Sequence, residues 1–103
     1  MKSIITKYTK NCMLCGTPTT TEHHFLFGSG TRPLADEDGV KGPVCSKCHN
    51  MGKIPERIHD NSAAEALSKM VGQLAWEKHQ VAAGMTEDEA RESFRKRYGM
   101  SYL

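Results

Sequence analysis

Four cysteines form two Cys-x-x-Cys pairs, Cys12 with Cys15 and Cys45 with Cys48. The two-residue gap lets both sulfurs of a pair converge on one ion. Two such pairs complete a tetrahedral shell of four sulfurs, the arrangement that zinc prefers in closed structural sites. Disulfide bonds and thioredoxin-like redox chemistry are the alternatives, but they suit a secreted domain and a βαβ context, and the sequence indicates neither. The cysteines therefore predict a structural Zn²⁺ ion.

Three histidines accompany the cysteines and are not needed to complete this shell. His23 and His24 are adjacent, and His49 directly follows the last cysteine. Adjacent residues of a strand point to opposite faces, so His23 and His24 are expected to serve different roles. One of them could share a second metal ion with His49, with positions left open for water and substrate, as in catalytic sites. The alternative is that all three are surface or hydrogen-bonded side chains.

The elements that must position these residues fall into two halves of different composition. All four prolines lie before residue 60, so this half predicts loops and short strands. Strands are expected over residues 2–8, 23–27 and 40–44, with a turn over residues 36–39 before the last strand. His23 and His24 would then lie on a strand, while the backbone of the second cysteine pair would hold His49 in place.

Beyond residue 60 the sequence predicts two helices, over residues 62–83 and about 87–98. Asp60 or Asn61 can cap the first helix, and Thr86 with Glu89 matches a capping box at the start of the second. Apolar residues recur at steps of three and four, which predicts the face that each helix buries. The residues expected to face the core are Ala63, Leu67, Met70, Val71, Leu74 and Trp76 of the first helix, and Ala90, Phe94 and Tyr98 of the second.

Length and composition limit the class of protein. The 103 residues, of which 38% are hydrophobic and 25% charged, are ordinary for one globular domain. No apolar run approaches the roughly 20 residues of a membrane span, and no secretory signal is visible, so no membrane partner is expected. The formal charge of +2 is too small to bind nucleic acid by net charge alone. Nucleic-acid binding would therefore depend on local charges or on a bound ion.

The order of these motifs resembles that of the HNH, or ββα-metal, nucleases, in particular small phage and prophage proteins of this type. The resemblance spans about residues 8–103. It rests on the first cysteine pair, the His-His-Phe-x-x-Gly stretch, and the second cysteine pair followed at once by His49 and Asn50. His59 and the closing Phe-Arg-Lys-Arg-Tyr-Gly-x-Ser-Tyr-Leu also look similar. The zinc knuckles around a metal site further resemble those of phage junction-resolving endonucleases.

This resemblance implies a fold and an activity. The fold would be a small α+β domain over residues 1–103, with a zinc-stapled ββα-metal finger over about residues 8–60 and two C-terminal helices over about residues 61–103. The activity would be metal-dependent DNA endonuclease, hydrolysing phosphodiester bonds. His24 would be the general base that activates water, and His23 and His49 would hold a catalytic divalent ion. That ion would be Mg²⁺ or Mn²⁺, with Zn²⁺ or Ni²⁺ as alternatives.

The sequence departs from the family pattern at two places. The family's middle Asn usually precedes the second cysteine pair, but residues 38–44 contain none; Asn50 and Asn61 are the candidates to replace it. Pro55 and the irregular residues 51–60 predict a short or distorted helix after the second pair. His59 in that stretch could be a third metal ligand, a phosphate contact or a neighbour of the helix cap.

Partners and the competing function follow from the remaining charges. The candidate contacts to a DNA backbone, which could equally be a solvated face, are Lys7, Lys10, Arg95, Lys96 and Arg97. The alternative function is a non-catalytic zinc module that binds nucleic acid or a protein. Because a single site of this kind cuts one strand, cutting both strands of DNA would require a homodimer or two encounters. The resemblance further implies an accessory partner in phage recombination or packaging, in the cytoplasm of a bacterial host.

Overall fold

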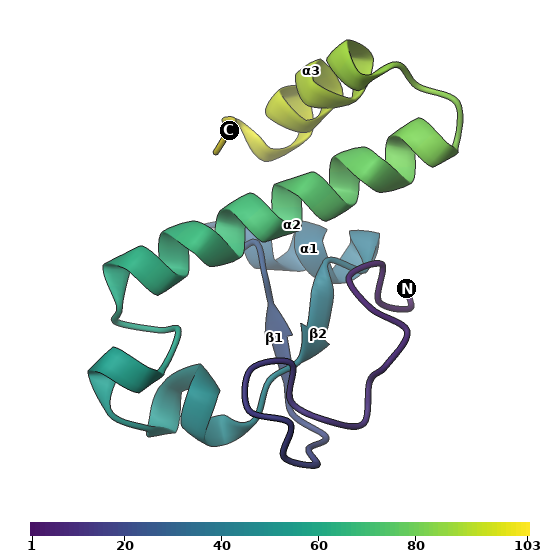
Figure 1. Ribbon diagram of the computed structural model, residues 1–103. Coiled ribbons are helices and arrows are strands. Elements are labelled where there is room, and N and C mark those ends of the chain that lie inside the picture. Colours follow the sequence, from purple (N-terminus) through teal and green to yellow (C-terminus); the bar gives the residue numbers. More distant parts are fainter.

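A two-stranded antiparallel sheet lies between the N-terminal loops and a long helix in the computed structural model, which describes residues 1–103 (Figure 1). Strand β1 (Glu22–His24) pairs with β2 (Lys41–Pro43), with His23 opposite Gly42. Helix α1 (Thr31–Asp38) connects the strands, and a π-helical turn η1 (Lys47–Met51) and a 3-10 turn η2 (Ile54–Glu56) follow them. The α+β class is therefore confirmed, whereas the specific ββα-metal fold stays a prediction.

Helices α2 (Ser62–Ala82) and α3 (Glu87–Tyr98) confirm the two predicted helices. Asn61 caps α2 by accepting a hydrogen bond from the backbone N–H of Ala64 at 3.2 Å. Thr86 and Glu89 form the expected capping box of α3. Figure 1 shows α2 running across the molecule, with α3 on one side and the sheet with α1 on the other. None of the helices combines the length and the apolar character needed to cross a membrane.

The first half differs from the prediction at three segments. Residues 2–8 form no strand, because the Ser3 hydroxyl accepts hydrogen bonds from the backbone N–H groups of Ile5 and Thr6, which a strand partner would otherwise use. The strand expected over residues 23–27 is the shorter β1, and the strand expected over residues 40–44 is β2. The expected turn over residues 36–39 is the end of α1, a helix that the sequence analysis missed.

Helix α1 forms although it contains Pro33, because this proline lies in the first turn, where a helix needs no backbone N–H donor. Gly39 ends the helix in the left-handed conformation, with φ of 75°. A β-carbon at Gly39 would lie 2.2 Å from the carbonyl oxygen of Lys2. Glycine at this position therefore lets the chain leave the helix and enter β2 beside the N-terminal segment.

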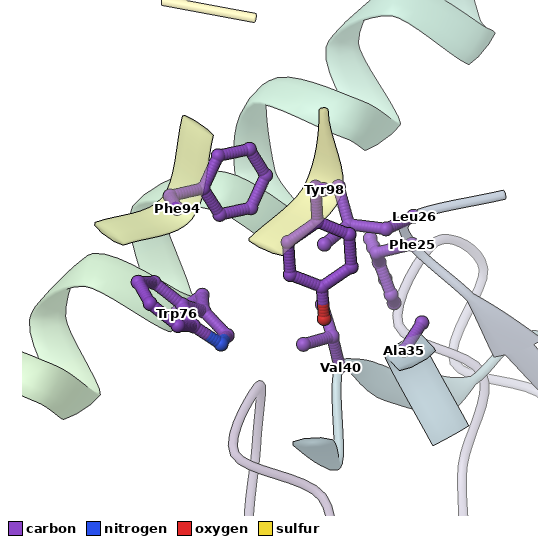
Figure 2. Packing of buried hydrophobic residues seen from close by; sticks show 7 residues of the cluster. All are labelled: Phe25, Leu26, Ala35, Val40, Trp76, Phe94 and Tyr98. Atoms are coloured by element: carbon purple, nitrogen blue, oxygen red, sulfur yellow. The ribbon is translucent and has the colours of Figure 1, made fainter. Parts of the chain in front are cut away.

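The main core forms where the sheet and α1 meet α2 and α3 (Figure 2). Its residues are Phe25, Leu26, Ala35, Val40, Trp76, Phe94 and Tyr98. This confirms the predicted core positions of Trp76, Ala90, Phe94 and Tyr98, all of which are buried. Gly72 of α2 makes a close contact here, since a β-carbon on it would lie 2.9 Å from Cγ of Leu26.

The buried face of α2 is not the one predicted. Its buried residues are Ser68, Gly72, Gln73, Trp76 and Glu77, whereas Leu67, Met70, Val71 and Leu74 are exposed. The polar inner face is stabilised by hydrogen bonds: Gln73 accepts one from the backbone N–H of Tyr102 at 2.6 Å and donates one to Glu77 at 2.8 Å. Periodicity identified a real apolar stripe but assigned it to the wrong side of the helix.

Asp38 at the end of α1 connects this helix to both C-terminal helices. Its carboxylate accepts hydrogen bonds from Trp76 Nε1 at 3.0 Å, from the Tyr98 hydroxyl at 2.6 Å, and from two nitrogens of Arg97, both at 2.7 Å. Burial alone would raise the pKa of Asp38, but the hydrogen bonds from Arg97, Tyr98 and Trp76 outweigh burial and hold that pKa below its usual value. The ionised carboxylate therefore stabilises the folded chain.

We predict that Asp38→Ala lowers the free energy of unfolding at pH 7 by about 2–4 kcal/mol, because it leaves donors of Trp76, Tyr98 and Arg97 without their acceptor. Because the folded pKa lies below the unfolded value of about 3.9, this stability is present above that pH and is lost as the pH falls through the folded pKa. Chemical denaturation of both proteins between pH 3 and pH 7 measures it. A constant difference in unfolding free energy across that range would contradict the assignment.

Candidate metal centres

The two cysteine pairs meet at one point. The loop after Cys12 turns back through a hydrogen bond from Gly16 N–H to the Cys12 carbonyl at 2.9 Å, and Met13 N–H binds the Pro43 carbonyl at 2.9 Å, just before the second pair. All four sulfurs lie within 4.8 Å of one another, and all four thiols are free. Sγ of Cys15 and Cys45 are 3.6 Å apart, close to the roughly 3.8 Å edge of a tetrahedral shell with metal–sulfur bonds of about 2.3 Å. The four thiols therefore form a candidate structural metal site.

The pKa values of these thiols are consistent with a site that ionises fully only around a cation. Hydrogen bonds from Thr17 lower the pKa of Cys15 to about 6. Burial, followed by the three neighbouring thiols, raises the pKa of Cys48 to about 12. Four thiolates this close repel one another, so complete ionisation requires a positive ion among them. A small apolar cluster of Cys12, Val44, Cys48 and Ile58 packs around the site.

His23, His49 and His59 form a second cluster, in which one ring nitrogen of each lies within 4.8 Å of the others. Nε2 of His49 and Nε2 of His59 are 3.0 Å apart. Two nitrogen ligands of one ion, at bond lengths of about 2.1 Å, lie about 3.0–3.4 Å apart in octahedral or tetrahedral geometry. The structure thus brings together the three residues that the sequence analysis singled out as ligands of a second ion.

The backbone after the second cysteine pair delivers two of these histidines. The π-helical turn η1 places His49, and the returning chain pairs with it through hydrogen bonds from Ile58 N–H to the Cys48 carbonyl at 2.8 Å and from His59 N–H to the His49 carbonyl at 3.0 Å. This five-residue turn agrees with the expectation of a short or distorted helix at this point. Single π-helical turns are frequent at functional sites.

Arg57 holds the segment between His49 and His59 in shape. Its guanidinium donates hydrogen bonds to the carbonyls of Asn50 at 3.0 Å, Gly52 at 3.0 Å and His59 at 2.9 Å, and to the Asp60 carboxylate at 2.7 Å. Asp60 has φ of 65°, which turns the chain sharply toward α2. Sequence reasoning missed Arg57, because a single arginine in a loop belongs to no recognisable motif. Its hydrogen-bond acceptors are visible only in the structure.

The tautomer of His23 follows from its neighbours. The Ser68 hydroxyl donates to the Phe25 carbonyl at 3.1 Å, so its only hydrogen is used, and it must accept from His23 Nε2–H at 2.8 Å. Nδ1 of His23 therefore carries a lone pair. This atom is fully buried and has no hydrogen-bond partner. A buried nitrogen lone pair in a cluster of two further imidazoles is what a metal ligand requires.

Two of the three clustered histidines, His23 and His49, have pKa values that favour the neutral form. Burial lowers the pKa of His23 to about 3, and the charges of His49 and His59 contribute to the shift. Burial also lowers the pKa of His49, with further contributions from His59, Arg32 and His24. Because neutral imidazole is the form that binds metals, these two rings can bind a cation without first losing protons. His59 Nδ1 lies 3.4 Å from a carboxylate oxygen of Glu65, which can orient the ring from behind.

His24 points away from His23, as strand alternation predicts, and binds Asp36 of α1. Its Nε2 donates to Oδ1 of Asp36 at 3.0 Å, while Nε of Arg32 approaches its Nδ1 at 3.4 Å. Lys41 binds the same Asp36 oxygen at 3.1 Å. The hydrogen bonds from His24 and Lys41 lower the pKa of Asp36 to about 2. Sequence reasoning missed Asp36, because residues 36–39 predict a turn and not the end of the helix that carries this residue.

The other candidate residues are placed differently. The side-chain amide of Asn61 is fully occupied: its Oδ1 accepts the capping hydrogen bond of α2, and its Nδ2 donates to the Ile54 carbonyl at 3.2 Å. Asn50 is exposed. Arg97 is bound to Asp38, and Arg95 pairs with Glu92 at 2.5 Å, so the basic strip of α3 is partly neutralised within the chain. Lys96 is exposed and has no ion-pair partner in the chain.

Lys7 and Lys10 line a groove of about 1320 Å³ between the N-terminal segment and the sheet. Two further lysines, Lys2 and Lys41, and several threonines also line it, and its one acidic residue is Glu22. Lys41 also connects the groove to the His24–Asp36 pair, because it binds Asp36 and lies opposite His24 in the sheet. A basic, hydroxyl-rich groove therefore begins beside His24.

Comparison of the whole chain with known proteins gives no match: no family model, no curated protein and no solved structure matches it. The resemblance to the HNH nucleases thus stays a hypothesis that rests on the types and spacing of the cysteines and histidines.

Proposed function

We propose that this chain is a metal-dependent DNA endonuclease with a structural Zn²⁺ ion in its four-cysteine site. The observation that carries the proposal is the buried, unpartnered Nδ1 of His23, whose ring clusters with those of His49 and His59. His24 directly follows His23 in β1 and binds Asp36 from the other face of the strand. Metal ligands and an oriented base, here on adjacent residues of one strand, are the two parts that phosphodiester hydrolysis needs.

His23, His49 and His59 would hold the catalytic ion and leave its remaining positions open for water and phosphate. Such an ion supplies Lewis-acid stabilisation of the phosphate and of the leaving oxygen. The donor set of three imidazole nitrogens suits Mn²⁺, Zn²⁺ or Ni²⁺ better than Mg²⁺, which prefers oxygen ligands. The structure thus gives a reason to rank Mg²⁺ below the other ions named from the sequence.

His24 is the proposed general base. Donation of Nε2–H to Asp36 fixes its tautomer and leaves the lone pair on Nδ1 to accept a proton from water. Asp36 holds the imidazole in this orientation, which is the role of an orienting residue in a catalytic pair. Asp36 therefore takes the position that the missing family Asn left open, instead of Asn50 or Asn61.

The lysine-lined groove is the proposed path of the DNA backbone toward this centre. Lys7 and Lys10 lie along it and Lys41 at its junction with the His24–Asp36 pair. Lysines bind phosphates by releasing counterions, so affinity would fall steeply with salt and depend little on sequence. Of the predicted DNA contacts, the structure favours Lys7 and Lys10 over Arg95 and Arg97, which are already paired.

One contact favours the alternative function, a zinc module that binds nucleic acid without cutting it. Arg32 approaches Nδ1 of His24, the atom that would accept the proton. Catalysis requires Arg32 to leave this atom, for example to bind a phosphate. If Arg32 stays, His24 is only part of a surface hydrogen-bond network.

Nicking of supercoiled plasmid DNA by the zinc-loaded chain tests the proposal, with Mn²⁺, Zn²⁺, Ni²⁺, Mg²⁺ or EDTA added. We expect nicking with transition metals, less with Mg²⁺ and none with EDTA. His49→Ala should abolish nicking and the binding of the second metal while retaining the first zinc. DNA binding without nicking under any metal would support the non-catalytic module instead.

We predict that Arg57→Ala weakens metal binding by the histidine cluster about 10- to 100-fold, as loss of an outer residue that orients ligands commonly does. The guanidinium supports three carbonyls and one carboxylate, so the loop that carries His59 should loosen. Isothermal titration with Mn²⁺ measures the affinity, and Arg95→Ala, on α3, is the control. Equal affinity of Arg57→Ala and the native chain would show that the loop keeps its shape without this residue.

A further inference from the structure

The outer face of α2 carries apolar side chains that nothing in the chain covers. Leu67, Met70, Val71 and Leu74 are 61%, 37%, 43% and 53% exposed. Their spacing of three, four and seven residues places them in one stripe along the helix. With Ala63 and Ala66, which are also exposed, they make up what we call the α2 stripe.

Charged residues beside the α2 stripe are turned toward their own chain. Lys69 lies over the ring of Phe27, with its Nζ 4.8 Å from the ring centroid. Glu65 accepts a hydrogen bond from Asp60 N–H at 3.2 Å and lies against His59. Between Ala63 and Leu74 the exposed residues of α2 therefore include no charged side chain. A surface helix normally shows the opposite pattern, with its polar side outward, and an uncharged apolar patch marks an interaction site.

We propose that the α2 stripe binds the same stripe of a second copy of this chain, with the two α2 helices antiparallel. A two-fold axis passing between Met70 and Val71 places Leu67 opposite the partner's Leu74 and Met70 opposite the partner's Val71. The stripe is thus complementary to itself, which a symmetric dimer requires. Because the stripe is uncharged, it can bind an identical stripe without bringing like charges together.

The charges at the ends of the stripe set the direction of pairing. In the antiparallel arrangement, exposed Lys78 lies next to the partner's Ala63. A parallel arrangement would instead place Lys78 beside the partner's Lys78. The antiparallel pair is favoured because it keeps these like charges apart.

The area agrees with a dimer of moderate affinity. The four large side chains leave on the order of 350 Å² of apolar surface exposed per copy, within the range of functional patches. With the alanines, Ser62 and the stem of Lys78 included, two copies would bury roughly 1,000 Å², near the lower limit for a specific interface. We therefore expect a dimer that dissociates in the micromolar range. This inference is independent of the proposed function.

Sedimentation equilibrium of the zinc-loaded chain between about 1 and 300 µM tests it. We expect a monomer–dimer equilibrium, and Leu67→Glu or Leu74→Glu should each weaken dimerisation at least 100-fold, because a two-fold axis makes each substitution count twice. Met100→Glu, at an apolar residue that is 51% exposed beyond α3, is the matched control and should dimerise like the native chain. Circular dichroism shows whether each variant keeps its helices.

The direction of pairing has its own test. Leu67→Glu combined with Leu74→Lys in one chain brings opposite charges together across an antiparallel interface, so this double variant should dimerise at least tenfold more tightly than either single variant. In a parallel pair, like charges would meet and no recovery would follow. A native chain that stays monomeric at 300 µM, or that dimerises unchanged by Leu67→Glu, overturns the proposal. Absence of recovery in the double variant overturns the antiparallel pairing.

Discussion

Removal of the ion from the four-cysteine site is expected to unfold the segments that carry the two cysteine pairs, while Phe25, Leu26 and Val40 stay packed in the main core. A structural Zn²⁺ contributes about 10–16 kcal/mol to the folding of small zinc domains, and the total stability of a domain is only about 5–15 kcal/mol. The apolar cluster at this site contains only Cys12, Val44, Cys48 and Ile58, and two of these residues are themselves proposed ligands. No larger apolar cluster at the two cysteine pairs replaces the stabilisation that the ion provides.

Cys45→Ser should therefore reduce the zinc content from one ion per chain to none and remove amide protection from the segments that carry the two cysteine pairs. Elemental analysis and amide hydrogen exchange measure the two effects. The control is Leu14→Ser, which changes a residue 59% exposed inside the first pair but removes no ligand. A native chain that is purified without zinc and protects its N-terminal amides would rule out the structural zinc.

Loss of this ion should also disturb the histidine cluster, since one segment carries both. Cys48 is a proposed zinc ligand, His49 is the next residue, and the backbone carbonyls of both accept hydrogen bonds from the segment that carries His59. The folded four-cysteine site is therefore needed to place His49 and His59 in the second cluster. Its effect on any activity should be larger than that of any substitution at the surface.

The parts of the site that could be predicted from sequence are those set by local spacing. The Cys-x-x-Cys pairs and the residue directly after the second pair are fixed relative to one another by a few backbone bonds. Adjacent strand residues must face opposite sides, so the separation of His23 from His24 was also predictable. The caps of α2 and α3 were predictable for the same reason, because each depends on residues within one turn.

The parts that could not be predicted depend on contacts between segments distant in sequence. Asp36 became a partner of His24 only when α1 folded against the sheet, and a lone aspartate carries no such signal. The α2 stripe shows the same limit more clearly. Periodicity locates an apolar face on a helix, but tertiary contacts decide which face is buried, and Ser68, Gln73 and Glu77 find hydrogen-bond partners inside.

His24→Ala is expected to lower the rate of plasmid nicking about 10²- to 10⁴-fold, the usual contribution of a positioned general base. Metal binding should be unchanged, because His24 lies on the face of β1 opposite His23 and is not part of the histidine cluster. This separates it from His49→Ala, which should lose the second metal and the activity together. The control is His79→Ala, which removes an exposed histidine of α2 that belongs to neither site.

Substitution of Asp36 provides a second test of His24 as the general base. If Asp36 orients His24, Asp36→Asn should lower the nicking rate by a smaller factor than His24→Ala. The two losses should not add, since removal of the base leaves nothing for Asp36 to orient. A double variant that is no slower than His24→Ala alone would support one catalytic unit. A His24→Ala chain that nicks at the native rate would remove His24 from the mechanism, whatever the metal content, and leave the histidine cluster to act with a different base.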